Sequence, residues 1–158
     1  MYDVMKIVNW LRVRNNSDLR TDDNAEELTQ LKAMKLLYYI QGASLIYLKS
    51  RLFSQDIVAW KYGPAVVEVH NKYSGKRGIV GNITDKDIND YKELNKDEKC
   101  ADILNVVYDT FGNISAYDLM KMTHTESPWR NTKQGSTITD DEMIKYFKTI
   151  VEVWHVKK

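Results

Sequence analysis

The chain has 158 residues, of which 43% are hydrophobic and 28% charged, so it is long enough to bury one sizeable core. Lysine and arginine number 23 against 22 for aspartate and glutamate, so the formal charge of +1 gives no global attraction to nucleic acid or anionic lipid. The single cysteine, Cys100, excludes an intrachain disulfide and a zinc site made of several cysteines. Neither a signal peptide nor a run of ~18 apolar residues is present, so we expect a cytoplasmic protein.

Apolar residues at helical spacing predict six helices. These are expected over residues 3–14, 26–48, 64–74, 97–111, 116–123 and 140–154. The residues placed to cap or open them are Asp3, Asn24 or a neighbour of it, Pro64, Asn95, Ser115 and Thr139. Between the helices we expect a polar loop over 15–24, a short strand or extended connector over 52–62, and an exposed turn or hairpin over 75–84.

No internal repeat or linker composition divides the chain. The predicted fold class is therefore mainly α: a single compact helical domain of about six helices over residues 1–158, with a small extended or hairpin element. The second helix has two apolar faces, which predicts a central, buried position. Gly42 lies inside this helix at a cost of about 1 kcal/mol relative to alanine, which is most easily understood if another backbone packs against it; simple tolerance is the alternative.

The sequence contains no motif for catalysis, metal binding or nucleotide binding. No histidine stands at zinc-ligand spacing, and the glycines of residues 75–84 do not form a phosphate-binding loop. His124 with Glu126 as an acid/base pair, or Cys100 with a histidine as a nucleophile pair, lacks an orienting motif. We therefore expect no enzyme and no cofactor, with Cys100 semi-buried in a helix and His124 satisfying backbone groups near a helix end.

Two aromatic segments flank predicted turns. Trp60 and Tyr62 precede Gly63-Pro64, and a hydrogen-bonding run from Thr123 ends at Pro128-Trp129. Large aromatic side chains in such places either fill the core or act as binding hot spots. The residues alone leave both alternatives open.

Three separated segments together resemble one family. The segments are LKAMKLLYYIQG at 31–42, AWKYGP at 59–64, and Thr123-His124 with Pro128-Trp129. Their order and spacing are similar to those of the Panacea domain, also called the SocA-like or phage-associated GepA family, and the resemblance extends from Tyr2 to about Phe147. It implies a mostly helical, non-enzymatic antitoxin that neutralises a toxin by direct protein contact. One branch resembles a proteolytic adaptor that delivers a toxin to the ClpXP protease.

The resemblance assigns a set of candidate partner-binding residues. They are Tyr38, Trp60, Lys61, Tyr62, Gly63, Pro64, His124, Pro128 and Trp129. The leading hypothesis is an antitoxin with a cognate toxin as its partner. The alternatives are a ClpXP adaptor, a phage-encoded interaction protein of another role, and an enzyme using His124 and Glu126. Nucleic-acid binding through Lys76 and Arg77 or Lys157 and Lys158 is also considered, but short basic clusters are usually solvated surface.

Overall fold

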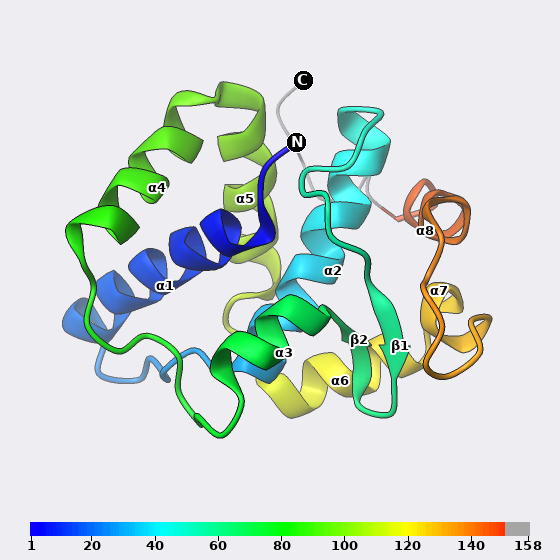
Figure 1. Cartoon of the computed structure of the whole chain (residues 1–158), viewed down its shortest axis with the longest axis horizontal. Coiled ribbons are helices and arrows are strands. Elements are labelled where there is room, and N and C mark those ends of the chain that lie inside the picture. The colour runs from blue at the N-terminus through cyan, green and yellow to red at the C-terminus, as the bar shows by residue number, and fades with distance from the viewer. Residues whose placement is uncertain (151–158) are drawn as a thin grey trace.

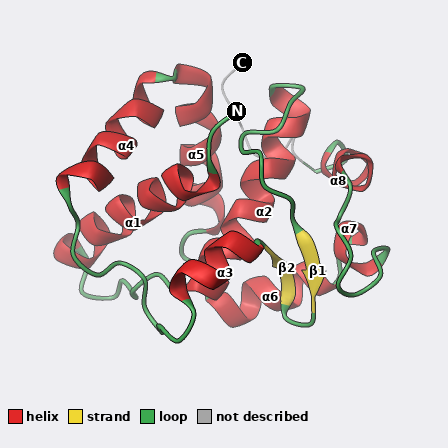
Figure 2. Cartoon of the chain, viewed as in Figure 1, coloured by secondary structure: helices red, strands yellow, loops and turns green. Residues whose placement is uncertain are grey.

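A computed structural model describes residues 1–150. This part of the chain has eight helices and one antiparallel hairpin, so the mainly α fold class is confirmed (Figures 1 and 2). The elements are α1 (Val4–Thr21), α2 (Gln30–Tyr47), β1 (Val58–Trp60), β2 (Gly63–Ala65), α3 (Val67–Tyr73), α4 (Asp85–Lys96), α5 (Glu98–Phe111), α6 (Ala116–His124), α7 (Ser127–Arg130) and α8 (Asp140–Phe147). No helix within residues 1–150 combines the length and the apolar character that a membrane crossing requires.

Helix α2 is the centre of the fold, as its two apolar faces predict. Every residue from Ala33 to Leu45 is buried. Helices α1, α4 and α5 lie on one side of it, and the hairpin, α7 and α8 lie on the other (Figure 1). Its N-cap is Thr29, whose side chain accepts a hydrogen bond from the Lys32 amide, and not Asn24 as the sequence suggested.

Helix α1 is longer than predicted, because it continues through most of the segment expected to be a loop. The polar residues of this segment make tertiary hydrogen bonds from a helical backbone. The side chain of Asn15 donates through Nδ2 to the Glu26 carbonyl and accepts through Oδ1 from the backbone N–H of Leu28. The Tyr108 hydroxyl donates to Asp18 at 2.6 Å. These partners are distant in sequence, so local composition could not reveal them.

Helix α4 is a second departure from the sequence prediction, which contained no helix at 85–96. It begins with a reciprocal capping box between Thr84 and Asp87. Only Leu94 among its apolar side chains is fully buried, while Ile88 and Tyr91 are half-buried. Ile88, Tyr91 and Leu94 are few apolar residues for a helix of this length. The helix is held by stacking of Tyr91 on Trp10 of α1, with ring centroids 5.6 Å apart, and by polar contacts with α1 such as the Arg12–Asp87 ion pair at 3.1 Å.

The prediction that Pro64 opens a helix is wrong. Gly63–Ala65 forms strand β2, which pairs with Val58–Trp60, and α3 begins only at Val67. The reason is the positive φ of Gly63, +105°, which turns the chain back along β1. The extended element expected over 52–62 is thus confirmed as the first strand of a hairpin. Of the two alternatives for residues 75–84, the structure has an exposed turn, which begins at Ser74 and Gly75, and not a hairpin.

Three helix ends also differ from expectation. Asp97, and not Asn95, caps α5, and α6 extends to His124. Helix α8 starts at the predicted cap Thr139 but ends at Phe147; the part of the prediction beyond residue 150 lies outside the described residues. The turn expected before Trp129 contains the short helix α7.

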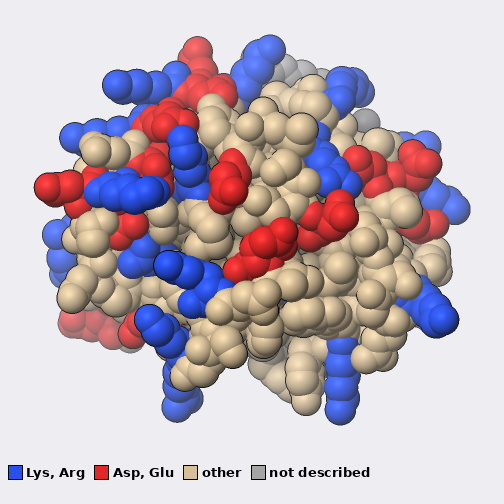
Figure 3. Space-filling view, viewed as in Figure 1, with Lys and Arg blue, Asp and Glu red and all other residues tan. Residues whose placement is uncertain are grey.

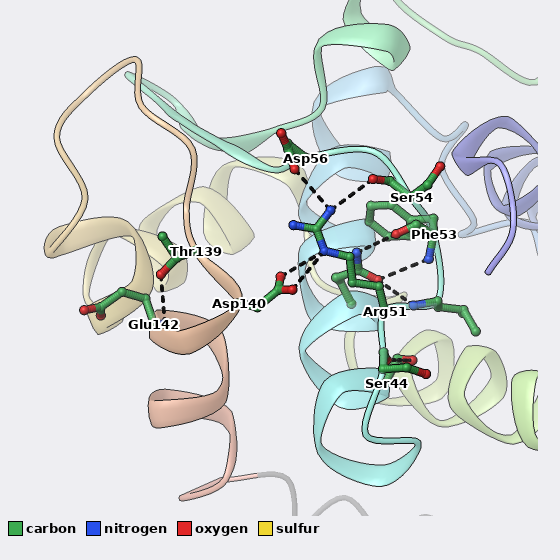
Figure 4. Close-up of polar contacts among 11 residues, drawn as sticks. Ser44, Arg51, Phe53, Ser54, Asp56, Thr139, Asp140 and Glu142 are labelled. Carbon is green, nitrogen blue, oxygen red and sulfur yellow. Dashed lines mark hydrogen bonds and ion pairs between the residues drawn. The ribbon is translucent and has the colours of Figure 1, made fainter.

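Arg51 fixes the start of α8 to the loop that follows α2 (Figure 4). Its guanidinium donates to both carboxylate oxygens of Asp140 at 3.0 Å, and to the Ser54 carbonyl and Asp56. Close by, the Gln41 side chain bonds the backbone of Leu52 and Phe53. This loop therefore joins α2 and α8 firmly.

The buried hydrophobic residues form one contiguous cluster. Cys100 belongs to it and is fully buried, and burial raises the pKa of its thiol to about 12. At neutral pH the side chain is a protonated, apolar core group, which speaks against its use as a nucleophile.

Candidate protein-interaction site

The three sequence segments that carry the family resemblance meet in space. Lys35 of α2 donates to the Pro64 carbonyl of β2 at 2.8 Å. The Trp129 indole of α7 donates to the Trp60 carbonyl of β1, also at 2.8 Å. Tyr38 of α2 donates to Glu126, between α6 and α7, at 2.9 Å. Each segment is thus bonded to both others, and the hairpin is held between α2 and the α6–α7 connection.

Glu126 is a buried carboxylate surrounded by tyrosines. Its two oxygens accept separate hydrogen bonds from Tyr38 and Tyr39, each at 2.9 Å, and Tyr146 of α8 lies close enough to affect its pKa. Burial raises the pKa of the carboxyl, and the tyrosine hydroxyls oppose this effect because they stabilise the charged form. Burial and the nearby carboxylate in turn raise the pKa of Tyr38 and Tyr39. Four side chains from three parts of the chain therefore depend on one another.

His124 does not share this network. Its ring stacks on Trp129 with centroids 4.0 Å apart and an interplanar angle of 20°. Its Nε2 is buried and has no hydrogen-bond partner in the part of the chain that the structure describes, so this atom does not satisfy a backbone group there. Because His124 faces Trp129 and Glu126 faces the tyrosines, the geometry does not support the acid/base pair considered from the sequence.

Lys35 was missed by sequence reasoning, although a lysine within an otherwise apolar buried helix is a recognisable signal. It is 1% exposed, and burial lowers the pKa of its amine to about 7. Its aliphatic stem lies against Gly63, where a Cβ would be 2.7 Å from Lys35 Cε and 2.9 Å from the Thr123 hydroxyl. The positive φ and this close packing together require glycine in the hairpin turn.

Lys35 makes the unfolding free energy depend on pH with a definite sign. Its pKa is about 7 in the folded chain and 10.5 when the side chain is fully solvated, as it is in the unfolded chain. Between these values the unfolded chain binds a proton that the folded chain has released, so stability rises with pH by at most about 1.4 kcal/mol per unit. The contribution is fully present above the unfolded pKa and is lost as the pH falls through the folded pKa.

We therefore expect the unfolding free energy of the wild type to rise, relative to that of Lys35→Met, between about pH 7 and about pH 9. Urea denaturation of both proteins across this pH window measures the difference between their unfolding free energies. Groups that titrate in the same way in both proteins do not contribute to this difference. Lys99→Met, at an exposed position of α5, is the matched control and should follow the wild type. Parallel profiles for Lys35→Met and the wild type would contradict the assigned titration.

The candidate residues differ sharply in exposure. Tyr38, Gly63, Pro64 and Pro128 are buried, and Trp60, His124 and Trp129 are half-buried. Lys61 and Tyr62, at the tip of the hairpin, are exposed, with Tyr62 retaining 58% of its accessible surface. The buried and half-buried candidate residues therefore support the hairpin, as the core alternative expects. Only the two residues at its tip face solvent, as the interface alternative expects.

Comparison with known families agrees with this assembly. A family model described as "Antitoxin SocA-like, Panacea domain" matches residues 33–130, which include the second and third segments and all but the first two residues of the first. Because the match covers more than half of the chain, the protein belongs to the SocA-like Panacea domain family, although the matched range is shorter than the expected one. No curated protein and no solved structure matches the chain. Within residues 1–150 no group of three or more histidine, cysteine, aspartate or glutamate side chains is arranged to hold a metal ion.

Proposed function

We propose that the chain is an antitoxin that acts in the cytoplasm, without catalysis, by binding a cognate toxin protein at the hairpin tip. Membership of an antitoxin-like family supports the role. The observation that carries the location is the exposure of Lys61 and Tyr62 within a signature whose other members are buried or half-buried. Tyrosine is enriched among the residues that dominate binding energy, so an exposed one on a fixed support is suited to this task.

The hairpin tip is supported on both sides of its turn. The carbonyl that precedes Lys61 is bonded by Trp129, and the carbonyl of Pro64 is bonded by Lys35. On the outer edge of β1, Ala59 exchanges hydrogen bonds with Gly135 and Ser136. A preformed tip loses little conformational entropy on binding, which favours affinity.

The test is growth rescue with the product of the adjacent reading frame. That product is expressed alone and together with this chain, and tagged chain is then purified. Toxicity that is relieved with formation of a stable complex supports the proposal. Relief with a shortened half-life of the toxin identifies a ClpXP-type adaptor instead, since a masking antitoxin leaves the toxin intact. If the frame is not toxic and no complex forms, the proposed function is overturned.

Replacing Tyr62 with alanine should weaken the complex without unfolding the chain. We expect Kd to rise by about tenfold, because a central tyrosine contributes ~1–2 kcal/mol or more to an interface. The melting temperature should stay within about 1 °C, because an exposed side chain contributes little to stability. Isothermal titration calorimetry and thermal unfolding measure the two effects.

Leu19→Ala on α1 serves as the control for Tyr62→Ala, since Leu19 is also partly exposed, at 36%, but lies on another element. This variant should bind as the wild type does. Equal affinities for Tyr62→Ala and the wild type would remove the hairpin tip from the interface.

A further inference from the structure

Two lysine–tyrosine pairs lie on neighbouring elements. On the hairpin, Lys61 Nζ lies 5.5 Å from the ring centroid of Tyr62, and on α6, Lys121 Nζ lies 5.2 Å from that of Tyr117. Strand β2 packs on α6, and Gly63, next to Tyr62, lies against Thr123 of α6, two residues after Lys121. We call the surface that carries the two pairs the hairpin–α6 surface. The tyrosines are 58% and 63% exposed, the largest values after Met1 among the large hydrophobic side chains of residues 1–150.

The cations of the hairpin–α6 surface have no acidic partner among the described residues. The ion pairs found in residues 1–150 lie between α1, α4 and α5, within α4, or around Arg51. Lys61 and Lys121 take part in none of them, and the ammonium group of each lies over a tyrosine ring. An uncompensated pair of cations attracts negative charge to this place.

The surroundings reinforce this positive character. Arg130 of α7 and Lys133 of the following loop are exposed. The exposed carboxylates nearest in sequence to Lys61 and Lys121 are Asp56, which is paired with Arg51, and Asp118. In Figure 3 the lower right part of the molecule, where Figure 1 places the hairpin, is mostly uncharged, and the charged atoms along its edge are basic. The surface thus combines aromatic area with positive charge.

We propose that the hairpin–α6 surface binds an acidic segment of the protein partner. Carboxylates of that segment pair with Lys61 and Lys121, while Tyr62 and Tyr117 pack against its aliphatic carbons. This proposal rests on the proposed function, since the partner protein is the toxin. Charge complementarity of this kind steers association and selects partners.

A protein segment fits this surface better than a nucleic acid does. The formal charge of the whole chain is only +1, so the cations gathered here are offset by an excess of carboxylates elsewhere. A polyphosphate strand that extends beyond the patch meets those carboxylates, whereas a short acidic segment needs only the patch itself. Two tyrosines on separate elements also do not form the continuous stacking path typical of single-strand binders.

The first experiment is an NMR titration of the ¹⁵N-labelled chain with a glutamate decapeptide, and in parallel with a glutamine decapeptide and decathymidylate. Saturating shifts of the Lys61, Tyr62, Tyr117 and Lys121 amides with the glutamate peptide alone support the proposal. They should vanish in Lys61→Gln/Lys121→Gln and persist in the control Lys92→Gln/Lys99→Gln on α4 and α5. Equal shifts with the glutamine peptide, stronger shifts with decathymidylate, or no shift at these amides overturns it.

The second experiment uses the complex with the product of the adjacent reading frame. Lys61→Glu/Lys121→Glu should raise Kd by at least about tenfold at low salt and by less at high salt, because charge reversal opposes steering. If the wild type forms no complex, the proposed function fails, and the peptide titration still decides the surface chemistry. If the wild type and the reversed variant bind equally at both salt concentrations, the acidic-partner inference alone fails.

Discussion

Replacing Gly42 with alanine should destabilise the protein by about 3 kcal/mol, although alanine is the better helix former by about 1 kcal/mol. A Cβ on Gly42 would lie 2.5 Å from Cδ2 and Cε2 of Phe147, and the whole ring faces this position. Phe147 is fully buried and its ring is flanked by Tyr38 at 5.3 Å and Tyr39 at 6.0 Å. Because the ring has no free space to enter, the added methyl group forces α8 away from α2.

Chemical denaturation of Gly42→Ala measures this cost, and a double-mutant cycle with Phe147→Leu assigns it. The smaller leucine leaves room for the alanine, so the double variant should be more stable than the sum of the two single changes predicts. Strict additivity would mean that the clash with Phe147 is not the cause. The neighbour that explains this glycine is thus an aromatic ring and not the backbone that the sequence suggested.

Glu126→Ala should lower the unfolding free energy by about 3–5 kcal/mol. The change removes the buried acceptor shared by Tyr38 and Tyr39, and it leaves the buried Tyr38 hydroxyl without its acceptor. An unsatisfied buried donor costs more than the original hydrogen bond contributed. Denaturant unfolding at neutral pH measures the loss.

The matched control is the triple variant Tyr38→Phe/Tyr39→Phe/Glu126→Met, which removes the carboxylate acceptor and two of its hydroxyl donors together. Since this variant leaves at most one hydroxyl unpaired, it should be clearly more stable than Glu126→Ala. A triple variant as unstable as the single one would show that packing, and not hydrogen bonding, is what Glu126 contributes. An unfolding free energy of Glu126→Ala within about 0.5 kcal/mol of the wild type would contradict the network altogether.

The sequence predicts those features of the fold that depend on local pattern. The two apolar faces of α2, the caps Ser115 and Thr139, and the extended segment before Gly63 are all found where they were expected. The features that it missed depend on partners far along the chain. Helix α4 is held by ring stacking and polar contacts with α1, and Pro64 lies in a strand because Gly63 turns the chain back and Lys35 bonds the Pro64 carbonyl.

The candidate site divides in the same way. The resemblance located the segments that meet around the hairpin, since family signatures mark positions without stating their neighbours. It did not identify Lys35 and Glu126 as the residues that connect these segments. Lys35 lies within an apolar helix that was interpreted as core, and Glu126 was interpreted only as a partner of His124. Tyr62 is exposed and Tyr38 is buried, and this difference follows from tertiary packing, which the sequence pattern does not reveal.

The reactivity of Cys100 toward thiol reagents reports local unfolding of this protein. Cys100 is the only cysteine in the chain, it is fully buried, and its protonated thiol is unreactive in the folded state. A thiol reagent can therefore label the chain only when the α5 region separates from the core, so the labelling rate follows that opening equilibrium. Toxin binding that stabilises the folded chain would slow this labelling, which offers a way to follow complex formation without adding a dye or a tag.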